Sequence, residues 1–385
     1  MDLNKEIKLS DLFKAARPKK TSRPKRTTQR KPKRQEIVGL KIGSSQLAAA
    51  HVVNNGGAKL VDVAREPLEP GIVVSGEVRD VTRLAEALDG FFTRSKLPRR
   101  NVRLGFGTNR VGVRVLDIEG VEDEDQLANA VTFRAHETMA IPMDQAVLDF
   151  HVVGEPDPEN GNAYRVVLAA AYREPIDQLV LACRAANLEL AGVDVEAFAL
   201  LRAVGARAGE GAEGEPTAVV AVALGHDRSI LAISDGTVCD FTRVLDWGGA
   251  KLDAAITRAT GVTMEEAAEL KLTLSLEPDA GDDGDPVAAR ARDAVRGELS
   301  NLARELIASL QFYQSQPESL AIGDILVTGG TSRMPGLVDE LATLVRARVA
   351  AADPLAAVDV PDTLPVSERD DLPSLAVAIG LGVDA

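Results

Sequence analysis

The chain has 385 residues, of which 45% are hydrophobic and 26% charged, and these are ordinary values for a globular protein. The composition excludes a wholly disordered, collagen-like or coiled-coil chain, and the length suffices for two or three domains. Charge is distributed unevenly along the chain. Residues 1–35 contain 13 Lys and Arg against 3 Asp and Glu, which gives this segment a net charge of +10. Because the whole chain has a net charge of −14, the remaining residues carry −24.

The basic segment comes first in the chain. Between Arg17 and Arg34 ten of eighteen residues are basic and none is acidic, so residues 1–35 are predicted to form a disordered arm. The apolar residues from Ile7 to Phe13 could form one amphipathic turn that orders only against a partner. The arm is interpreted as a solubilising tail, or as a site for an anionic membrane or an acidic protein. Nucleic acid is disfavoured, because the body is acidic and no aromatic residues interleave the basic run.

The first half of the body is predicted to alternate between strands and helices. The predicted strands are 37–40, 46–53, 59–65, a pair at 101–108 and 112–118, and then 146–153, 165–171 and 188–194. The predicted helices are 81–95, 124–139 and 175–187. A segment rich in Gly and Glu at 209–215 is predicted to be a hinge.

The same order of elements begins again after the hinge. The predicted strands are 218–224, 229–234, 237–245 and 324–328, and helices are predicted from Gly249 and at 287–314, 337–349 and 373–383. The helix at 287–314 places Leu299, Leu302, Ala303, Leu306 and Leu310 on one face, which predicts that it packs against a core. Because the order of strand, glycine turn, two strands and helix occurs twice, the sequence indicates a duplicated α/β fold.

Membrane spans and metal sites are not expected. No apolar run exceeds seven residues, whereas a bilayer-spanning helix needs roughly 18. Cys183 and Cys239 belong to no Cys or His cluster, which suits a reducing compartment and indicates no metal site. We therefore expect a cytoplasmic protein.

Three glycine turns stand at corresponding places in the duplicated pattern. They are Gly43-Ser44-Ser45, the turn beginning Gly225-His226, and Gly329-Gly330-Thr331-Ser332. Glycine lets backbone N–H groups approach an anion, and nests of such groups bind phosphates. The three turns together predict a nucleotide cleft between two lobes.

These residues carry a family resemblance. The chain resembles PilM, the actin-like protein of type IV pilus assembly, which is itself similar to FtsA. The matching stretches are GLKIGSSQLAAAHV (39–52), AHETMAIPMDQAVLDFHVV (135–153), VDVEAFALLRA (193–203), LDWGGAKLDAAI (245–256), EEAAELK (265–271), SLQFYQSQ (309–316), ILVTGGTSRMPGL (325–337) and SLAVAIGLG (374–382). They run in the family's order from about residue 37 to the end of the chain.

The resemblance implies an α/β actin-like fold of two lobes with a small inserted subdomain. The first lobe would comprise residues 36–116 and 172–207, and the second 216–272 and 323–385, joined by a hinge at 208–215. The inserted subdomain would be 117–171, and a helical cap would occupy 273–322.

The chain departs from the family at the metal side of the cleft. The resemblance implies an aspartate in each of the first two turns, facing the metal of the nucleotide, but this chain has Lys41 and Ala223 there. Magnesium needs one or two carboxylates, and an ammonium group would repel it. We therefore expect no catalytic residues and no magnesium. ATP would be held without metal, with Lys41 neutralising a phosphate, or not bound at all.

The base side of the cleft is kept better. The resemblance implies that Glu269 and Lys271 approach the ribose, and that Gly329, Gly330, Ser332 and Arg333 form the turn beside the base. For Glu269 and Lys271, a solvated helix face is the alternative interpretation. The remaining cleft candidates are Gly43, Ser44, Ser45, Gly225 and His226.

The favoured function is that of a non-catalytic scaffold at the inner face of the cell membrane. The resemblance implies a groove, formed by about residues 102–153, for the cytoplasmic peptide of a PilN-like membrane protein. Phe106, Phe133 and Phe150 are the candidate apolar anchors, although each could equally be a core residue. The alternatives are a magnesium-dependent actin-like ATPase and an FtsA-like polymer tethered to the membrane through the arm.

Overall fold

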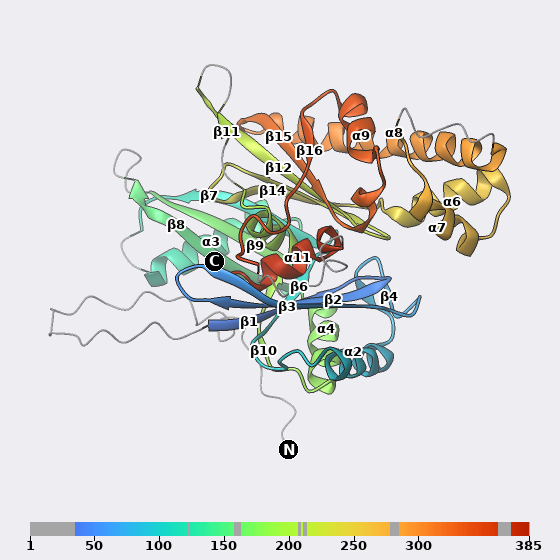
Figure 1. The fold of residues 1–385 in the computed structure, drawn as a ribbon. Helices are drawn as coiled ribbons and strands as arrows, with labels where there is room; N and C mark the ends of the chain where they lie inside the picture. Colours follow the sequence, from blue (N-terminus) through green and yellow to red (C-terminus); the bar gives the residue numbers. More distant parts are fainter. Residues whose placement is uncertain are drawn as a thin grey trace.

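A computed structural model describes residues 35–121, 124–157, 163–206, 209–210, 214–277, 285–360 and 371–384. The predicted basic arm therefore lies outside the described residues, except for Gln35. Two large sheets with their helices form two lobes, and α11 (Leu372–Gly382) lies between them (Figure 1). No helix in the described ranges is long and apolar enough to cross a membrane.

The first lobe is built on a five-stranded sheet of order β10-β6-β1-β2-β3. Its strands are β1 (Gln35–Ile42), β2 (Gln46–Asn54), β3 (Ala58–Pro67), β6 (Val102–Phe106) and β10 (Leu190–Val195). The first three form the predicted antiparallel meander, and β6 and β10 extend the sheet in parallel. The helices α2 (Val81–Ser95) and α4 (Arg173–Ala185) pack their apolar faces on one side of this sheet.

A small hairpin connects the sheet of the first lobe to α2. It consists of β4 (Val73–Val74) and β5 (Glu77–Val78), which pair antiparallel. The helix α2 then begins after Asp80, whose carboxylate accepts a hydrogen bond from the Arg83 N–H at 2.9 Å. Such an N-cap satisfies one of the free N–H groups of the first turn, so the helix starts at the residue that the sequence predicted.

The second lobe repeats the topology of the first. Its strands are β11 (Gly209–Glu210), β12 (Pro216–Leu224), β13 (Ser229–Ser234), β14 (Cys239–Leu245), β15 (Ala321–Thr328) and β16 (Val349–Ala351). The order β16-β15-β12-β13-β14 corresponds strand by strand to the order β10-β6-β1-β2-β3 of the first sheet. The directions also agree: β12 is antiparallel to β13 and parallel to β15, and β1 is antiparallel to β2 and parallel to β6. The predicted duplication is thus confirmed.

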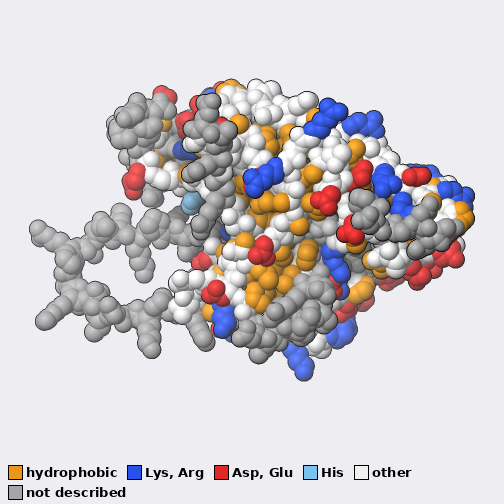
Figure 2. All heavy atoms as spheres, turned by 45° about the horizontal axis from the view of Figure 1, so that its top comes forward, with side chains coloured by type: hydrophobic (Ala, Val, Ile, Leu, Met, Phe, Trp, Pro, Cys, Tyr) orange, Lys and Arg blue, Asp and Glu red, His pale blue; other side chains and the backbone are white. Residues whose placement is uncertain are grey.

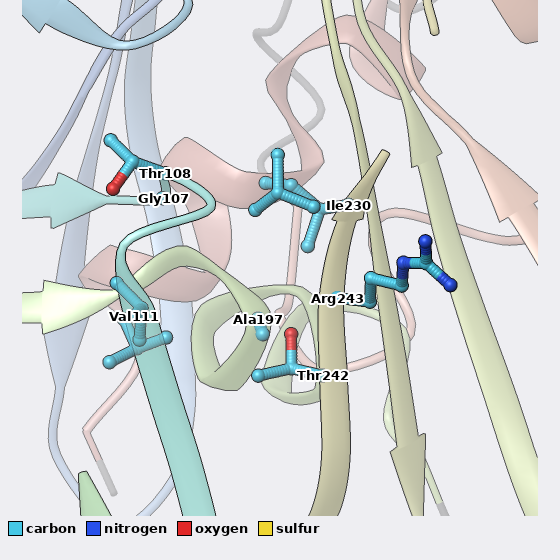
Figure 3. A pocket seen from close by; sticks show the side chains of 9 residues that line it. Gly107, Thr108, Val111, Ala197, Ile230, Thr242 and Arg243 are labelled. Carbon is cyan, nitrogen blue, oxygen red and sulfur yellow. The ribbon is translucent and has the colours of Figure 1, made fainter. Parts of the chain in front are cut away.

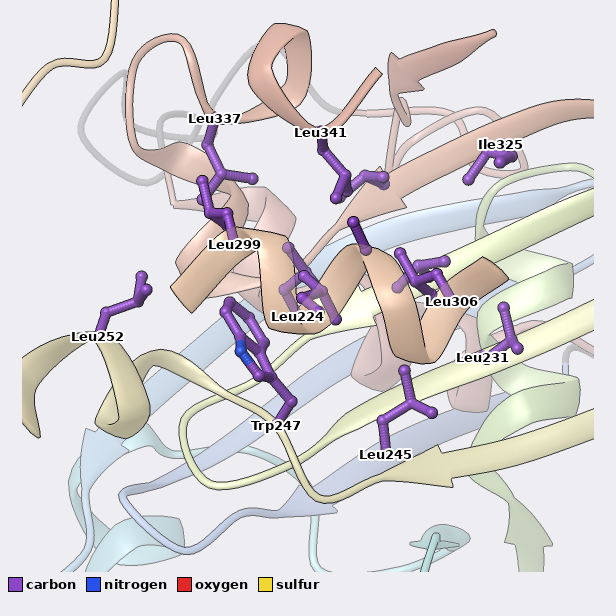
Figure 4. Packing of buried hydrophobic residues seen from close by; sticks show 14 of the residues in the cluster. Leu224, Leu231, Leu245, Trp247, Leu252, Leu299, Leu306, Ile325, Leu337 and Leu341 are labelled. Atoms are coloured by element: carbon purple, nitrogen blue, oxygen red, sulfur yellow. The ribbon is translucent and has the colours of Figure 1, made fainter. Parts of the chain in front are cut away.

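A helical layer covers the outer face of the second sheet. It contains α6 (Gly249–Thr260), α7 (Met264–Thr273), α8 (Pro286–Gln314) and α9 (Leu337–Val345). Leu299 and Leu306 of α8 are buried against sheet residues such as Leu224, beside the fully buried Trp247 (Figure 4). All five residues predicted to share one face of α8 are buried, which confirms that this face packs on the core.

The helix predicted at 337–349 ends early. Arg346 has a left-handed backbone (φ 57°) and caps α9, and Val349–Ala351 then forms β16 beside β15. A left-handed residue cannot continue a helix, and such caps are a common way for helices to end. The last residue of the predicted helix therefore belongs to the sheet.

Two helices fill the space between the sheets. α11 contacts β1 and β2, and α5 (Glu196–Ala203) packs on both α11 and the second sheet. A Cβ at Gly39 would lie 2.1 Å from the Ala378 carbonyl oxygen, and a Cβ at Gly380 would lie 1.8 Å from that of Ala199. Glycine is required at such close backbone approaches, so these two positions bring the layers together.

A separate three-stranded sheet projects beside both lobes. It has the order β7-β9-β8, with β7 (Val111–Ile118), β8 (Ala146–Asp157) and β9 (Ala163–Tyr172), and α3 (Glu124–Thr138) packs on it. The predicted pairing of 101–108 with 112–118 is wrong, because β6 pairs with β1 and β10 whereas β7 pairs with β9. The short connection between them carries the chain from one sheet to another, so the third sheet begins at Val111.

Candidate functional site

The cleft turns of the second lobe lie in mutual contact. The Gly225 carbonyl oxygen accepts hydrogen bonds from the Gly249 N–H at 2.9 Å and from the Thr331 hydroxyl at 2.8 Å. Gly329 has φ +99°, and a Cβ there would lie 2.3 Å from the Leu224 carbonyl oxygen. A left-handed conformation and such a close approach both require glycine. The structure therefore brings the predicted second and third turns together.

Lys41, the penultimate residue of β1, lies beside a buried carboxylate. Its Nζ lies 3.7 Å from Glu196 Oε2, and the Glu196 side chain is only 2% exposed. Glu196 belongs to the first turn of α5, where the helix dipole favours a negative charge. Its side chain also packs against Gly105 and Gly107, where a Cβ would come within 3.1 Å of it. The resemblance to a known family did not single out Glu196; an acidic residue opening an otherwise apolar helix is the signal that could have found it.

Ala223 is buried in the second sheet, two residues before Gly225. It pairs with Ile230 and Thr328 in the second sheet, and it packs in an apolar cluster with residues of α5. The two positions expected to bear metal-facing carboxylates thus present an ammonium already next to Glu196 and a buried methyl group. Because magnesium needs carboxylate oxygens in near-octahedral order, these residues do not fit a magnesium ion. No group of three or more potential metal ligands occurs in the described ranges.

The first turn contains the candidates Gly43, Ser44 and Ser45. The Gly43 N–H donates to the Gln46 carbonyl at 2.9 Å, and the Ser45 carbonyl accepts from the Leu68 N–H at 2.9 Å. The Ser44 hydroxyl oxygen is buried and has no hydrogen-bond partner in the part of the chain that the structure describes. A buried hydroxyl without a partner is costly, so the Ser44 hydroxyl is a candidate for hydrogen bonding to a ligand.

Lys271 reaches the cleft turns, whereas Glu269 does not share its environment. The Lys271 ammonium lies 2.6 Å from Asp253 Oδ1 and donates to the Gly249 carbonyl at 3.2 Å. Asp253 is buried on α6, and sequence reasoning missed it. Glu269 is exposed on α7, and the end of the molecule that carries α6 and α7 has both acidic and basic side chains on its surface (Figure 2). This arrangement corresponds to the solvated-face interpretation of Glu269, while Lys271 is held by Asp253.

The third turn is tied to the first lobe by an ion-pair network. The Arg333 guanidinium pairs with Asp371, and the second oxygen of Asp371 pairs with Arg65 of β3. Ser332 donates its hydroxyl hydrogen to the Gly329 carbonyl at 2.7 Å, and Gly330 lies beside Ser374. Arg333 and Ser332 are thus engaged with protein groups. His226, in the second turn, is exposed.

The three candidate anchor aromatics have different environments. Phe106 is 3% exposed and belongs to the core of the first lobe. Phe150 is partly buried and packs against the core between α3 and its sheet. Phe133 is 64% exposed on α3. Of the three, Phe133 alone presents most of its ring to a partner.

A small cavity lies where the three sheets meet (Figure 3). It is lined by Gly107 and Thr108 after β6, by Ala197 of α5, and by Ile230 and Thr242 of the second lobe. Arg243 points away from it and donates to the Ser309 hydroxyl at 3.2 Å. The cavity is separate from the glycine turns, so it does not mark the nucleotide cleft.

A salt bridge links the third sheet to the second lobe near this cavity. Arg165 of β9 lies 2.9 Å from Asp235 and 3.5 Å from Asp240. Burial raises the pKa of Asp240 to about 6, and the neighbouring Asp235 carboxylate adds to this rise, while Arg165 opposes it. A carboxyl group that titrates so near neutrality makes this link sensitive to pH.

Comparisons with known proteins place these features in a family. The model of the family described as type IV pilus assembly protein PilM matches residues 39–385. The chain is also similar to a solved structure of a PilM-PilN type IV pilus biogenesis complex, with 26% identity and a TM-score of 0.75, covering 91% of this chain and 98% of that one.

More distant structures share the fold. EutJ, an ethanolamine utilization protein from Carboxydothermus hydrogenoformans, is 15% identical with a TM-score of 0.50, covering 91% of this chain and 90% of that one. MreB5 of Spiroplasma citri bound to AMPPNP is 13% identical with a TM-score of 0.53, covering 91% and 95%. The predicted actin-like fold of two duplicated lobes is confirmed.

Proposed function

Because the chain belongs to the family of the type IV pilus assembly protein PilM, we propose that it is a cytoplasmic scaffold that binds the cytoplasmic peptide of a PilN-like inner-membrane protein. The observation that carries this proposal is the similarity to PilM in a PilM-PilN complex over 91% of the chain. Fold alone would not be sufficient, since one fold hosts many functions. The same role could serve a type IV pilus or a related secretion system.

The exposed face of α3 is the candidate contact for the peptide. Phe133 projects from it with 64% of its surface exposed, and large aromatic side chains of this kind are common anchors in protein interfaces. Arg134 and Glu137 flank it as an ion pair at 3.0 Å, so the surroundings are polar. An apolar anchor within a polar rim is typical of a peptide-binding surface.

The second part of the proposal concerns the nucleotide cleft. It is degenerate in this chain: Lys41 is next to Glu196, and Ala223 is buried in an apolar cluster. These contacts support a cleft that binds ATP without magnesium or does not bind it. The chain would then act in the pilus machinery by binding a partner protein and not by hydrolysing ATP. Residues 1–35 would add contact with an anionic membrane.

A peptide titration tests the docking role. The labelled N-terminal peptide of the PilN-like protein is titrated with the unmodified full chain and with the variants Phe133→Ala and Phe312→Ala. Phe312→Ala is the matched control, because Phe312 is similarly exposed at 55% but lies on α8. We expect Phe133→Ala to weaken binding about tenfold or more, as for an interface anchor, and Phe312→Ala to leave it unchanged. Absence of binding by the unmodified chain up to about 1 mM, where the standard binding free energy is only about −4 kcal/mol, would refute docking.

A further inference from the structure

The second glycine turn contacts the first lobe through two consecutive residues. Its partner is the hairpin of β4 and β5, which lies on the same side of the molecule as α6 and α7 (Figure 1). The Ser75 N–H, at the tip of this hairpin, donates a hydrogen bond to Asp227 Oδ2 at 3.0 Å. Asp227 and Ser75 are 152 residues apart in the chain, so this bond crosses from one lobe to the other.

The next residue of the turn makes the second contact. The Arg228 guanidinium lies against Gly76, where an added Cβ would be 1.3 Å from Nη1 and 2.3 Å from Cζ. Gly76 also has φ +76°, a conformation that side chains disfavour. Only glycine at this position leaves room for the guanidinium, so the hairpin tip and Arg228 are complementary in shape.

Among the described residues, Arg228 forms no ion pair with a carboxylate. Its Nη1 is buried and has no hydrogen-bond partner within the described ranges. In contrast, Lys41 lies beside Glu196 and Lys271 beside Asp253. Of the cleft cations, Lys41 and Lys271 thus lie beside buried acids, whereas Arg228 is placed against the hairpin of the first lobe.

We propose that Asp227 and Arg228 form, with Ser75 and Gly76, a clasp that holds the two lobes closed without a nucleotide. In a two-lobed protein, a ligand favours closure by contacting both lobes, and it can shift the equilibrium only by its differential affinity for the closed state. The clasp provides such contacts from the chain itself. It goes beyond the proposed docking function and does not depend on the peptide, so either can fail alone.

The turn that carries Asp227 and Arg228 depends on a glycine. The Arg228 carbonyl oxygen lies where a Cβ of Gly225 would be, at 2.4 Å, so the turn is tight and its shape depends on glycine at its first position. The sequence after Gly225, His-Asp-Arg, thus places an acceptor and a guanidinium toward the hairpin.

Hydrogen–deuterium exchange of the full chain tests the clasp. The variant Asp227→Ala/Arg228→Ala is compared with the matched control Asp324→Ala/Arg348→Ala, which removes an exposed Arg–Asp pair of 3.1 Å within the second lobe. Without nucleotide, we expect amide exchange in residues 73–78 to rise tenfold or more in the clasp variant and to stay unchanged in the control. Equal exchange in the unmodified chain and the clasp variant would overturn the proposal, as would protection in the unmodified chain that appears only after ATP is added.

A double-mutant cycle separates the clasp from a loss of folding. Gly76→Ala is made alone and in the Arg228→Ala background, and melting temperatures are compared. The backbone strain from the positive φ is the same in both backgrounds, but the clash with Arg228 exists only in the first. We expect Gly76→Ala to lower the melting temperature less when Arg228 is absent, because residues in contact are not additive. An identical shift in both backgrounds would show that Gly76 and Arg228 do not touch.

Discussion

The ammonium nitrogen of Lys41 lies 3.7 Å from Oε2 of Glu196, a buried glutamate in the first turn of α5. Removing a buried carboxylate from water without a partner costs several kcal/mol, so Lys41 is needed to compensate Glu196. The expectation that Lys41 neutralises a nucleotide phosphate therefore meets a competing partner inside the protein. This relationship, more than the loss of an aspartate, explains why a cation stands at the end of β1.

Removing the lysine should destabilise the chain. We expect Lys41→Ala to lower the free energy of unfolding by about 3 kcal/mol, because it leaves Glu196 buried and unpaired. The double variant Lys41→Ala/Glu196→Gln should recover most of this loss, since no buried charge remains. Urea unfolding of the three proteins measures both effects; an unchanged midpoint for Lys41→Ala would contradict the pairing.

Magnesium should make no difference to any nucleotide binding. A ligand that binds the native state stabilises it by RT ln(1 + [L]/Kd) and so raises its melting temperature. Because the positions of Lys41 and Ala223 do not supply carboxylates, we expect the melting temperatures with ATP plus magnesium and with ATP plus EDTA to agree within about 1 °C. A clearly higher value with magnesium, or magnesium-dependent phosphate release, would favour the ATPase alternative.

Truncating Phe106 and truncating Phe133 should have different effects on the stability of the chain. Phe106 is buried in the first lobe, so Phe106→Ala should cost about 3–5 kcal/mol of stability. Phe133 is exposed, so Phe133→Ala should change stability by less than about 0.5 kcal/mol while weakening the proposed peptide contact. Denaturant unfolding measures the stabilities. Equal losses in the two variants would mean that α3 packs differently from the arrangement described.

The pH dependence of stability should reveal Asp240. Its pKa is raised from 3.8 to about 6 in the folded state, so the folded protein takes up a proton at a higher pH than the unfolded chain does. Stability from this group therefore rises as the pH falls from about 6 toward 4, and it is lost as the pH rises through the same window.

Asp240→Asn should remove that contribution. We expect the variant to lose the part of the stability change between pH 4 and 6 that Asp240 causes, measured as the urea midpoint at each pH. Asp235→Asn is the comparison: Asp235 pairs with Arg165 at 2.9 Å and accepts hydrogen bonds from the Thr237 and Val238 N–H groups, so its loss should destabilise the chain. Because its carboxylate also adds to the raised pKa of Asp240, the same variant should move the pH-dependent change to lower pH. The same pH profile in Asp240→Asn and the unmodified chain would refute the assignment.

Local sequence signals predicted the elements of this fold well. The apolar spacing from Leu299 to Leu310 predicted the buried face of α8, and the repeated order beginning at Ile37 and Ala218 predicted two sheets of equal topology. Such patterns depend on neighbours within a few residues, which is why they can be read along the chain. The pairing of β6 and β7 could not be read in this way, since an apolar strand does not specify its partner.

The sequence by itself determined the duplicated α/β order, the glycine turns, the absence of acidic residues at positions 41 and 223, and the resemblance to the PilM family. Only the tertiary structure decided that Lys41 lies beside Glu196, that Phe106 is buried and Phe133 exposed, and that Arg228 lies against Gly76. The reason is physical: turn geometry and helix periodicity are local properties, whereas burial and charge pairing depend on residues far apart in the chain, such as Lys41 and Glu196 or Arg65 and Asp371, which meet only when the chain folds.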